Sequence, residues 1–208
     1  ANGRPRRPAR RIARPWRRCG PAPGAQRIWE KEMTIAPTLT TKRLILRHHK
    51  MADFEPLYDL LGSDRAKFMD GPYSRRQSWY GLASEVGSWS LKGFGSWGVE
   101  LRDSKDFIGQ IGINQPAHFP ETEIGWIFLA KGEGKGYAFE AARKALAWAQ
   151  DTLQNSSIVS YIANDNVRSI SLAERLGATQ DPNAARPEGD SKDDTLVYRH
   201  ALTNSPAA

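Results

Sequence analysis

The chain has 208 residues, a formal net charge of +7 and 39% hydrophobic residues, which suits one domain with a sizeable core. No apolar run approaches the roughly 20 residues that a membrane-spanning helix needs, so we expect a soluble protein. Cys19 is the single cysteine. It excludes a disulfide within the chain and, in the region after it, a thiolate metal site or a cysteine nucleophile, and it is typical of the reducing cytoplasm.

The positive charge is concentrated in residues 1–32, where nine arginines and Lys31 face two glutamates, so that residues 33–208 carry about −1. Five prolines and few apolar residues predict disorder, because such a segment cannot bury enough surface to offset its ordering entropy. Three interpretations stay open: an organellar presequence, a nucleic-acid-binding arm, or residues upstream of a natural start at Met33. We favour the last, because the segment lacks serine and no nucleic-acid recognition motif continues into the domain.

Residues 33–208 are predicted to form a single domain. The expected elements, in chain order, are a strand at 41–47, helices at 52–61 and 75–90, strands at 96–102, 107–114 and 121–129, a helix ending near 153, a strand at 157–163, a helix at 166–176, a loop at 181–194 and a strand at 195–201. Asp53 is a candidate N-cap of the first helix, and Gly62 is its expected end. This order predicts an α+β (mixed α/β) fold with a central, mostly antiparallel sheet and helices on both faces.

The most informative segment is residues 129–138, where an apolar strand breaks into glycines at 132, 134 and 136 before a helix begins. Glycine permits a backbone in which successive N–H groups turn toward one point, and the positive end of the following helix adds to their attraction for an anion. The spacing fits neither a P-loop nor a dinucleotide fingerprint. The segment predicts a cradle for a diphosphate, made by main-chain amides of residues 131–138.

Four segments, in order and at plausible spacing, resemble the GNAT superfamily of acyl-CoA-dependent N-acyltransferases, and within it the ribosomal-protein alanine N-acetyltransferases. They are residues 39–47, the hairpin 98–101 with 107–112, the strand and turn 123–126 with 134–141, and the helix 166–169 with 174–177. The glycine turn fits the family pattern (Gln/Arg)-x-x-Gly-x-(Gly/Ala), with Lys131 in the first place. The resemblance covers about residues 38–202 and implies the GNAT fold, acetyl-CoA as cosubstrate and an amine as acceptor.

The resemblance also implies which residues hold the cosubstrate. The strand would splay near Ile127, Phe128 and Leu129, whose backbone groups would pair with the pantetheine amides while one N–H stabilises the developing oxyanion. Asn166 would hydrogen-bond the pantetheine arm, or else serve as the N-cap of its helix. The diphosphate would lie on Lys131, Gly132, Gly134, Lys135, Gly136, Tyr137 and Ala138.

Acetyl transfer needs a base for the amine and a proton for the departing thiolate. Glu123 is the candidate base, directly or through a water, because it precedes the strand that leads to the glycine turn; Glu121 is the alternative. Many GNAT enzymes carry a tyrosine on the last helix as general acid, but this chain has Ala173 there. In the ribosomal subgroup a serine can occupy another position of that helix, so Ser169 is the candidate proton donor, or else a small residue that lets the cosubstrate approach.

Among the tryptophans, Trp97 is the best candidate for contact with the acceptor, together with Asn114 at the end of the partner strand. The four histidines show no metal-ligand spacing, and no metal is expected. We therefore expect a cytoplasmic, acetyl-CoA-dependent N-acetyltransferase that acts on a protein N-terminal α-amine or a small amine such as an antibiotic, polyamine or amino acid. A non-catalytic acyl-CoA-binding module is a further alternative. Neither a membrane nor nucleic acid is an expected partner, and monomer and homodimer both remain open.

Overall fold

The computed structural model describes residues 35–153 and 157–202, so the predictions made for residues 1–32, Cys19 and Met33 lie outside the described residues. The elements in chain order are β1 (Leu39–Thr40), β2 (Leu44–Arg47), a 3₁₀ turn (Met51–Asp53), α1 (Phe54–Leu61), a 3₁₀ helix (Asp64–Met69), α2 (Arg75–Lys92), β3 (Ser96–Leu101), β4 (Phe107–Asn114), β5 (Glu123–Phe128), a 3₁₀ turn (Ala130–Gly132), α3 (Tyr137–Thr152), β6 (Ser157–Ala163), α4 (Val167–Arg175), β7 (Thr179–Gln180) and β8 (Thr195–Ala201).

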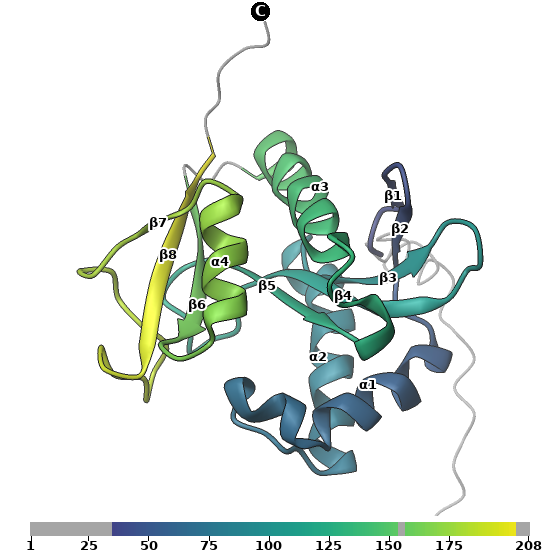
Figure 1. Ribbon diagram of the computed structural model, residues 1–208, viewed down its shortest axis with the longest axis horizontal. Coiled ribbons are helices and arrows are strands. Elements are labelled where there is room, and N and C mark those ends of the chain that lie inside the picture. The colour runs from purple at the N-terminus through teal and green to yellow at the C-terminus, as the bar shows by residue number, and fades with distance from the viewer. Residues whose placement is uncertain (1–34, 154–156, 203–208) are drawn as a thin grey trace, which may run out of the picture. The chain divides into compact units, whose positions relative to one another are not determined.

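The strands form an eight-stranded sheet in the order β1-β2-β3-β4-β5-β6-β8-β7 (Figure 1). All neighbouring strands pair antiparallel except β5 and β6, which are parallel. The predicted mixed α/β fold with a mostly antiparallel sheet is therefore confirmed.

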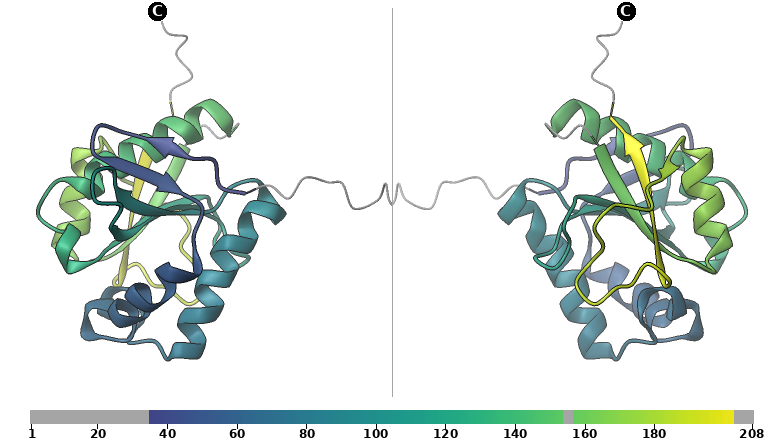
Figure 2. Two further views of the ribbon diagram at one scale, coloured as in Figure 1. Left: turned by 90° about the vertical axis from the view of Figure 1, so that its right-hand side faces the viewer. Right: turned by 90° about the vertical axis from the view of Figure 1, so that its left-hand side faces the viewer.

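Helices cover both faces of the sheet, with α3 on one face and α1 and α2 on the other (Figure 2). The side of α3 that faces the sheet consists of alanines, which are 0% exposed. Their short side chains let the helix lie close to the isoleucines of β4 and β5, which make up much of the core. This packing fixes the position of the glycine turn, because the turn is the direct link between β5 and α3.

Two local predictions are corrected. The expected strand at 41–47 begins only at Leu44, because the Thr41 N–H donates to the Leu44 carbonyl at 3.0 Å and closes a tight turn between β1 and β2. Asp53 does not cap α1 with its side chain. Its buried carboxylate instead accepts from the Lys50 N–H at 2.9 Å and pairs with the Arg47 guanidinium at 2.7 Å.

No helix within residues 35–153 and 157–202 is long and apolar enough to cross a membrane.

Candidate active site

A cleft opens where β5 and β6 separate. Glu123 and Val159 form the one register pair between these strands, and the Ser160 hydroxyl donates to the Ile124 carbonyl at 2.8 Å beside it. Beyond that point the edge of β5 faces the cleft instead of a neighbouring strand. This leaves backbone groups of the edge available to a ligand, apart from the Phe128 carbonyl, which accepts from the Arg65 guanidinium at 3.1 Å. The cleft has a volume of about 1360 Å³ and is lined by residues of α2, of strands β3 to β6 and of both helices α3 and α4.

The predicted splay is present, but it begins earlier on β5 than expected. Ile127 and Phe128 line the cleft. Leu129 does not belong to its lining, because the Leu129 N–H donates to the Ile108 carbonyl at 2.9 Å and its carbonyl accepts from the Gly132 N–H at 2.8 Å. The prediction that Leu129 contacts pantetheine through its backbone is therefore corrected.

The glycine turn presents a group of unpaired amides to the cleft. Gly134 and Gly136 have φ of +72° and +76°, a region that side chains with a Cβ rarely adopt. Within the described part of the chain, the N–H groups of residues 134–139 have no hydrogen-bond partner, and α3 begins at Tyr137 with no side-chain cap. Free amides at the positive end of a helix of 16 residues are a suitable site for an anion.

Three other residues of the predicted cradle, Lys131, Gly132 and Lys135, make contacts within the chain. Gly132 is buried, and its N–H is already bonded; a Cβ there would lie 3.0 Å from the Ile108 carbonyl oxygen, so glycine serves close packing. Lys131 and Lys135 are exposed, and neither is among the residues that line the cleft. The Lys131 ammonium lies 4.0 Å from an Asp106 oxygen, and the Lys135 ammonium donates to the Lys131 carbonyl at 3.0 Å. The roles of Lys131, Gly132 and Lys135 toward a diphosphate stay predictions.

Glu123 lies at the point where the strands separate. It is the first residue of β5, opposite Asn114 of β4, and the nearby Tyr161 backbone N–H acts to lower the pKa of its carboxyl. Burial raises the pKa of Glu123 to about 7, and the charge of Glu85 adds to this shift. A carboxylate with such a pKa can accept a proton near neutral pH.

Glu121, the alternative base, lies outside the cleft and is held in an ion pair. Its two carboxylate oxygens accept from the Arg199 guanidinium at 2.6 and 3.0 Å, and Arg199 also pairs with Asp181 at 2.9 Å. Glu121 is not among the residues that line the cleft. The geometry therefore favours Glu123.

Two residues of the cleft were missed by the sequence analysis. Glu85 reaches the cleft from α2, where it is the single acidic residue, and its Oε1 accepts from the Gln110 amide at 3.0 Å. Tyr161 lines the cleft from β6, and burial raises the pKa of its hydroxyl to about 12. Glu85 could have been found from the sequence, because it is an acidic residue in a helix that otherwise lacks acids. Tyr161 could not, because an aromatic residue in a strand is common and does not indicate a site.

The N-terminus of α4 brings Asn166 and Ser169 into the cleft. The Asn166 side-chain oxygen Oδ1 accepts from the Ser169 N–H at 3.3 Å, which makes Asn166 the N-cap of α4. The Ser169 hydroxyl accepts from the Trp126 indole N–H at 3.2 Å, so its own hydrogen is free to be donated elsewhere. The roles of Asn166 and Ser169 toward a ligand stay predictions.

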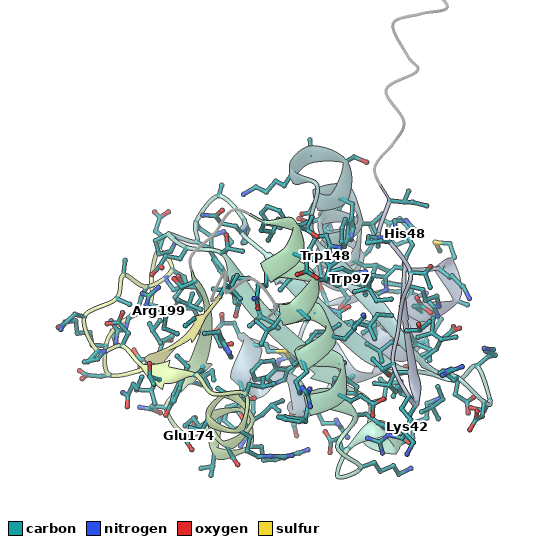
Figure 3. All side chains as sticks on the ribbon, turned by 90° about the horizontal axis from the view of Figure 1, so that it is seen from above. Lys42, His48, Trp97, Trp148, Glu174 and Arg199 are labelled. Atoms are coloured by element: carbon teal, nitrogen blue, oxygen red, sulfur yellow. The ribbon has the colours of Figure 1, made fainter. Side chains whose placement is uncertain are left out.

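Trp97 is not in the cleft. It is 0% exposed, its indole N–H donates to the Pro37 carbonyl at 2.9 Å, and its ring centroid lies 5.0 Å from that of Trp148 (Figure 3). The prediction that Trp97 contacts the acceptor is therefore corrected: its side chain points to the α3 face of the sheet. Asn114, the other predicted acceptor contact, lies on the opposite face and lines the cleft.

Comparisons with known proteins agree with this geometry. The acetyltransferase (GNAT) domain family matches residues 43–179. The crystal structure of an acetyltransferase from Agrobacterium tumefaciens str. C58 is 41% identical, with a TM-score of 0.75, and covers 79% of this chain and 94% of that one. The N-acetyltransferase YnaD of Bacillus subtilis (strain 168), itself uncharacterized, is 26% identical over 141 residues, which are 67% of this chain and 81% of YnaD.

RimL, a ribosomal L7/L12 α-N-protein acetyltransferase solved in complex with coenzyme A, shares the fold at 15% identity, with a TM-score of 0.63 over 79% of this chain and 98% of RimL. The family match spans well over half of the chain, and it includes β5, the glycine turn and α4. The chain belongs to the GNAT family of N-acetyltransferases.

Proposed function

We propose that this enzyme transfers the acetyl group of acetyl-CoA to a primary amine, which attacks the thioester directly. The observation that carries the proposal is that one cleft contains both the unpaired amides of residues 134–139 and the Glu123 carboxylate. The amides suit the diphosphate of coenzyme A. The carboxylate, with its pKa of about 7, suits the removal of a proton from an amine.

In the proposed reaction, protons move between the reactants, the side chains of the cleft and solvent. The amine gives a proton to Glu123, directly or through a water, and its nitrogen bonds to the thioester carbonyl carbon. An N–H on the free edge of β5, near Ile127 and Phe128, stabilises the oxyanion that forms. The carbon–sulfur bond then breaks, and the thiolate takes a proton from Ser169 or from solvent.

The binding of coenzyme A is supported by charges at the mouth of the cleft. Arg65 and Arg168 both line it, and both pair with Glu133 of the glycine turn, at 2.5 and 3.1 Å. Two guanidinium groups beside the free amides favour a ligand that carries several phosphate charges. RimL, which shares the fold, was solved with coenzyme A.

For the acceptor we favour a protein N-terminal α-amine, with a small amine as the alternative. An α-amino group has a pKa of about 7.7–8.0, close to that of Glu123, so proton transfer between them costs little. A lysine side chain, with a pKa of about 10.4, gives up its proton less readily.

The test is an assay of free thiol released from acetyl-CoA in the presence of unblocked peptides, polyamines, aminoglycosides and amino acids. The control is each peptide with its N-terminus blocked. We expect release with at least one unblocked amine and none with the blocked peptides. Calorimetry that detects acetyl-CoA binding without turnover on any amine would instead support the non-catalytic acyl-CoA-binding module.

A further inference from the structure

Glu85 has a carboxylate oxygen that is buried without a partner. Its Oε1 accepts from the Gln110 side-chain amide, but its Oε2 has less than 1 Å² of exposed surface and no hydrogen bond. Leaving a buried acceptor unsatisfied is costly, and a charged one more so. Because Glu85 lines the cleft, this oxygen points to a group that arrives with a ligand.

Within the described residues, no lysine or arginine pairs with the acids at this place. Burial raises the pKa of Glu85, and the charged groups that face it are Glu123 of β5 and His49, which follows β2 and acts to lower this pKa. The Nδ1 atom of His49 lies 3.3 Å from Asp53, and neither Glu85 nor Glu123 takes part in an ion pair with any described lysine or arginine. Two carboxylates in one hollow without a positive partner favour a ligand that supplies the charge.

The register of the sheet shows that the hollow lies between these two acids. Gly112 of β4 pairs with Gly125 of β5, and this row carries no side chain on either strand. On one side of the row, Asn114 pairs with Glu123. On the other side, Gln110 pairs with Ile127, and Gln110 is the residue that bonds Glu85.

The two glycines of this row have different surroundings. A Cβ on Gly112 would lie 2.2 Å from the Ser96 Oγ and 2.4 Å from the Asn114 Nδ2, so this glycine makes room for the Ser96–Asn114 pair, which covers it. A Cβ on Gly125 would lie 3.7 Å from each carboxylate oxygen of Glu123, within the space that borders the base. The part of the cleft between the two carboxylates is thus bordered by Gly125 and by the neutral side chains of Ser96, Gln110 and Asn114.

We infer that Glu85 is a specificity-determining residue, whose free carboxylate oxygen binds the acceptor as an ammonium ion in the hollow between Glu85 and Glu123. The inference rests on the proposed function and narrows it to alkyl ammonium acceptors. The ammonium donates one N–H to Glu85 and passes a proton to Glu123. The neutral amine that results attacks the thioester, and its second proton leaves for solvent. The carbon–sulfur bond breaks as the amide forms, and the thiolate takes a proton from Ser169 or from solvent.

The test compares two acceptors of similar size, cyclohexylamine, which is cationic at neutral pH, and aniline, which is neutral. The wild type is expected to prefer cyclohexylamine in kcat/KM. Glu85→Gln keeps the hydrogen-bonding shape but removes the charge, and it should raise the KM for cyclohexylamine by about 10- to 100-fold while changing that for aniline much less. Asp103→Asn removes an exposed charge from the β3–β4 turn and is the matched control, expected to change neither value.

Calorimetry provides a readout without turnover. Cyclohexylamine should bind to the complex of the wild type with coenzyme A, and this binding should be lost in Glu85→Gln. Glu85→Asp keeps the charge but withdraws it by one methylene, and should weaken the binding of cyclohexylamine more than that of aniline. This variant is used for the test if Glu85→Gln does not fold. Equal effects on both amines in either variant would overturn the inference. If the wild type acetylates no amine at all, it is the proposed function that fails.

Discussion

Asn114 and Glu123 are register partners across β4 and β5, at the end of the sheet where β5 and β6 part. The Asn114 amide donates to the Ser96 hydroxyl at 3.1 Å, so it is engaged with a neighbour on β3. For Glu123, burial therefore raises the pKa of the carboxyl more than the nearby Tyr161 backbone N–H lowers it. This explains why an acid at the start of an ordinary strand has the pKa of a base suited to neutral pH.

We expect Glu123→Gln to lower kcat by about 10²- to 10⁴-fold, the usual contribution of a general base. The carboxylate form accepts the proton, so the rate of the wild type should rise as pH increases through about 7, and the variant should lose this rise. Initial rates of thiol release across that pH range are the measurement. Glu121→Gln, which removes a carboxylate paired with Arg199, is the control and should keep the wild-type pH profile. The assignment of the base fails if the two variants have the same profile.

The same carboxyl should make the stability of the enzyme depend on pH. The pKa of Glu123 is raised from 4.5 to about 7 on folding, so the folded state holds this proton more tightly than the unfolded state. The free energy of unfolding should then fall as pH rises from about 4.5 to about 7. Glu123→Gln lacks this dependence, and its Tm relative to the wild type should increase over that interval and then level off. Thermal unfolding without ligand is the measurement, and a Tm difference that does not change with pH would contradict the raised pKa.

The arrangement of the strands and the glycine turn could be predicted because their causes are local. The bounds predicted for the strand Ser157–Ala163 agree with the structure to the residue, since the segment is rich in β-branched and aromatic residues. Gly134 and Gly136 were predicted to present free amides because a left-handed backbone before a helix is a property of the residues themselves.

What could not be predicted depends on contacts between distant segments. Glu85 and Gln110 are 25 residues apart, and only the packing of α2 on β4 brings them together. Leu129 loses its free N–H to Ile108, which belongs to another strand. Alternation along β3 shows that Ser96 and Trp97 point to opposite faces, but it does not show which face holds the cleft.

The position of Trp97 in the core leads to a prediction that separates stability from acceptor binding. Trp97→Phe removes the hydrogen bond to the Pro37 carbonyl and loosens the contact with Trp89, whose ring centroid is 4.7 Å away. We expect a loss of about 1–3 kcal/mol of unfolding free energy, because the partly buried Pro37 carbonyl loses its partner and the core loses part of a large side chain. The KM for the acceptor should not change. Trp79→Phe, at a position that is 41% exposed, is the control and should affect stability much less. A raised KM in Trp97→Phe, at unchanged stability, would restore a role for Trp97 in acceptor binding.

The free amides of the glycine turn can be tested with two glycines that share a backbone conformation. Gly134 and Gly177 have φ of +72° and +86°, and a Cβ at either position would meet no atom within 4 Å. Alanine at each position should therefore cost a similar amount of stability, about 1–2 kcal/mol, through the left-handed backbone alone. Gly134 belongs to the cradle, whereas Gly177 ends α4 with its N–H bonded to the Glu174 carbonyl. When Gly134→Ala relaxes toward negative φ, the N–H groups around it turn away from their common point. Calorimetry with coenzyme A should therefore show weaker binding by Gly134→Ala and unchanged binding by Gly177→Ala. Equal affinities in two variants of equal stability would mean that the diphosphate is not held by these amides.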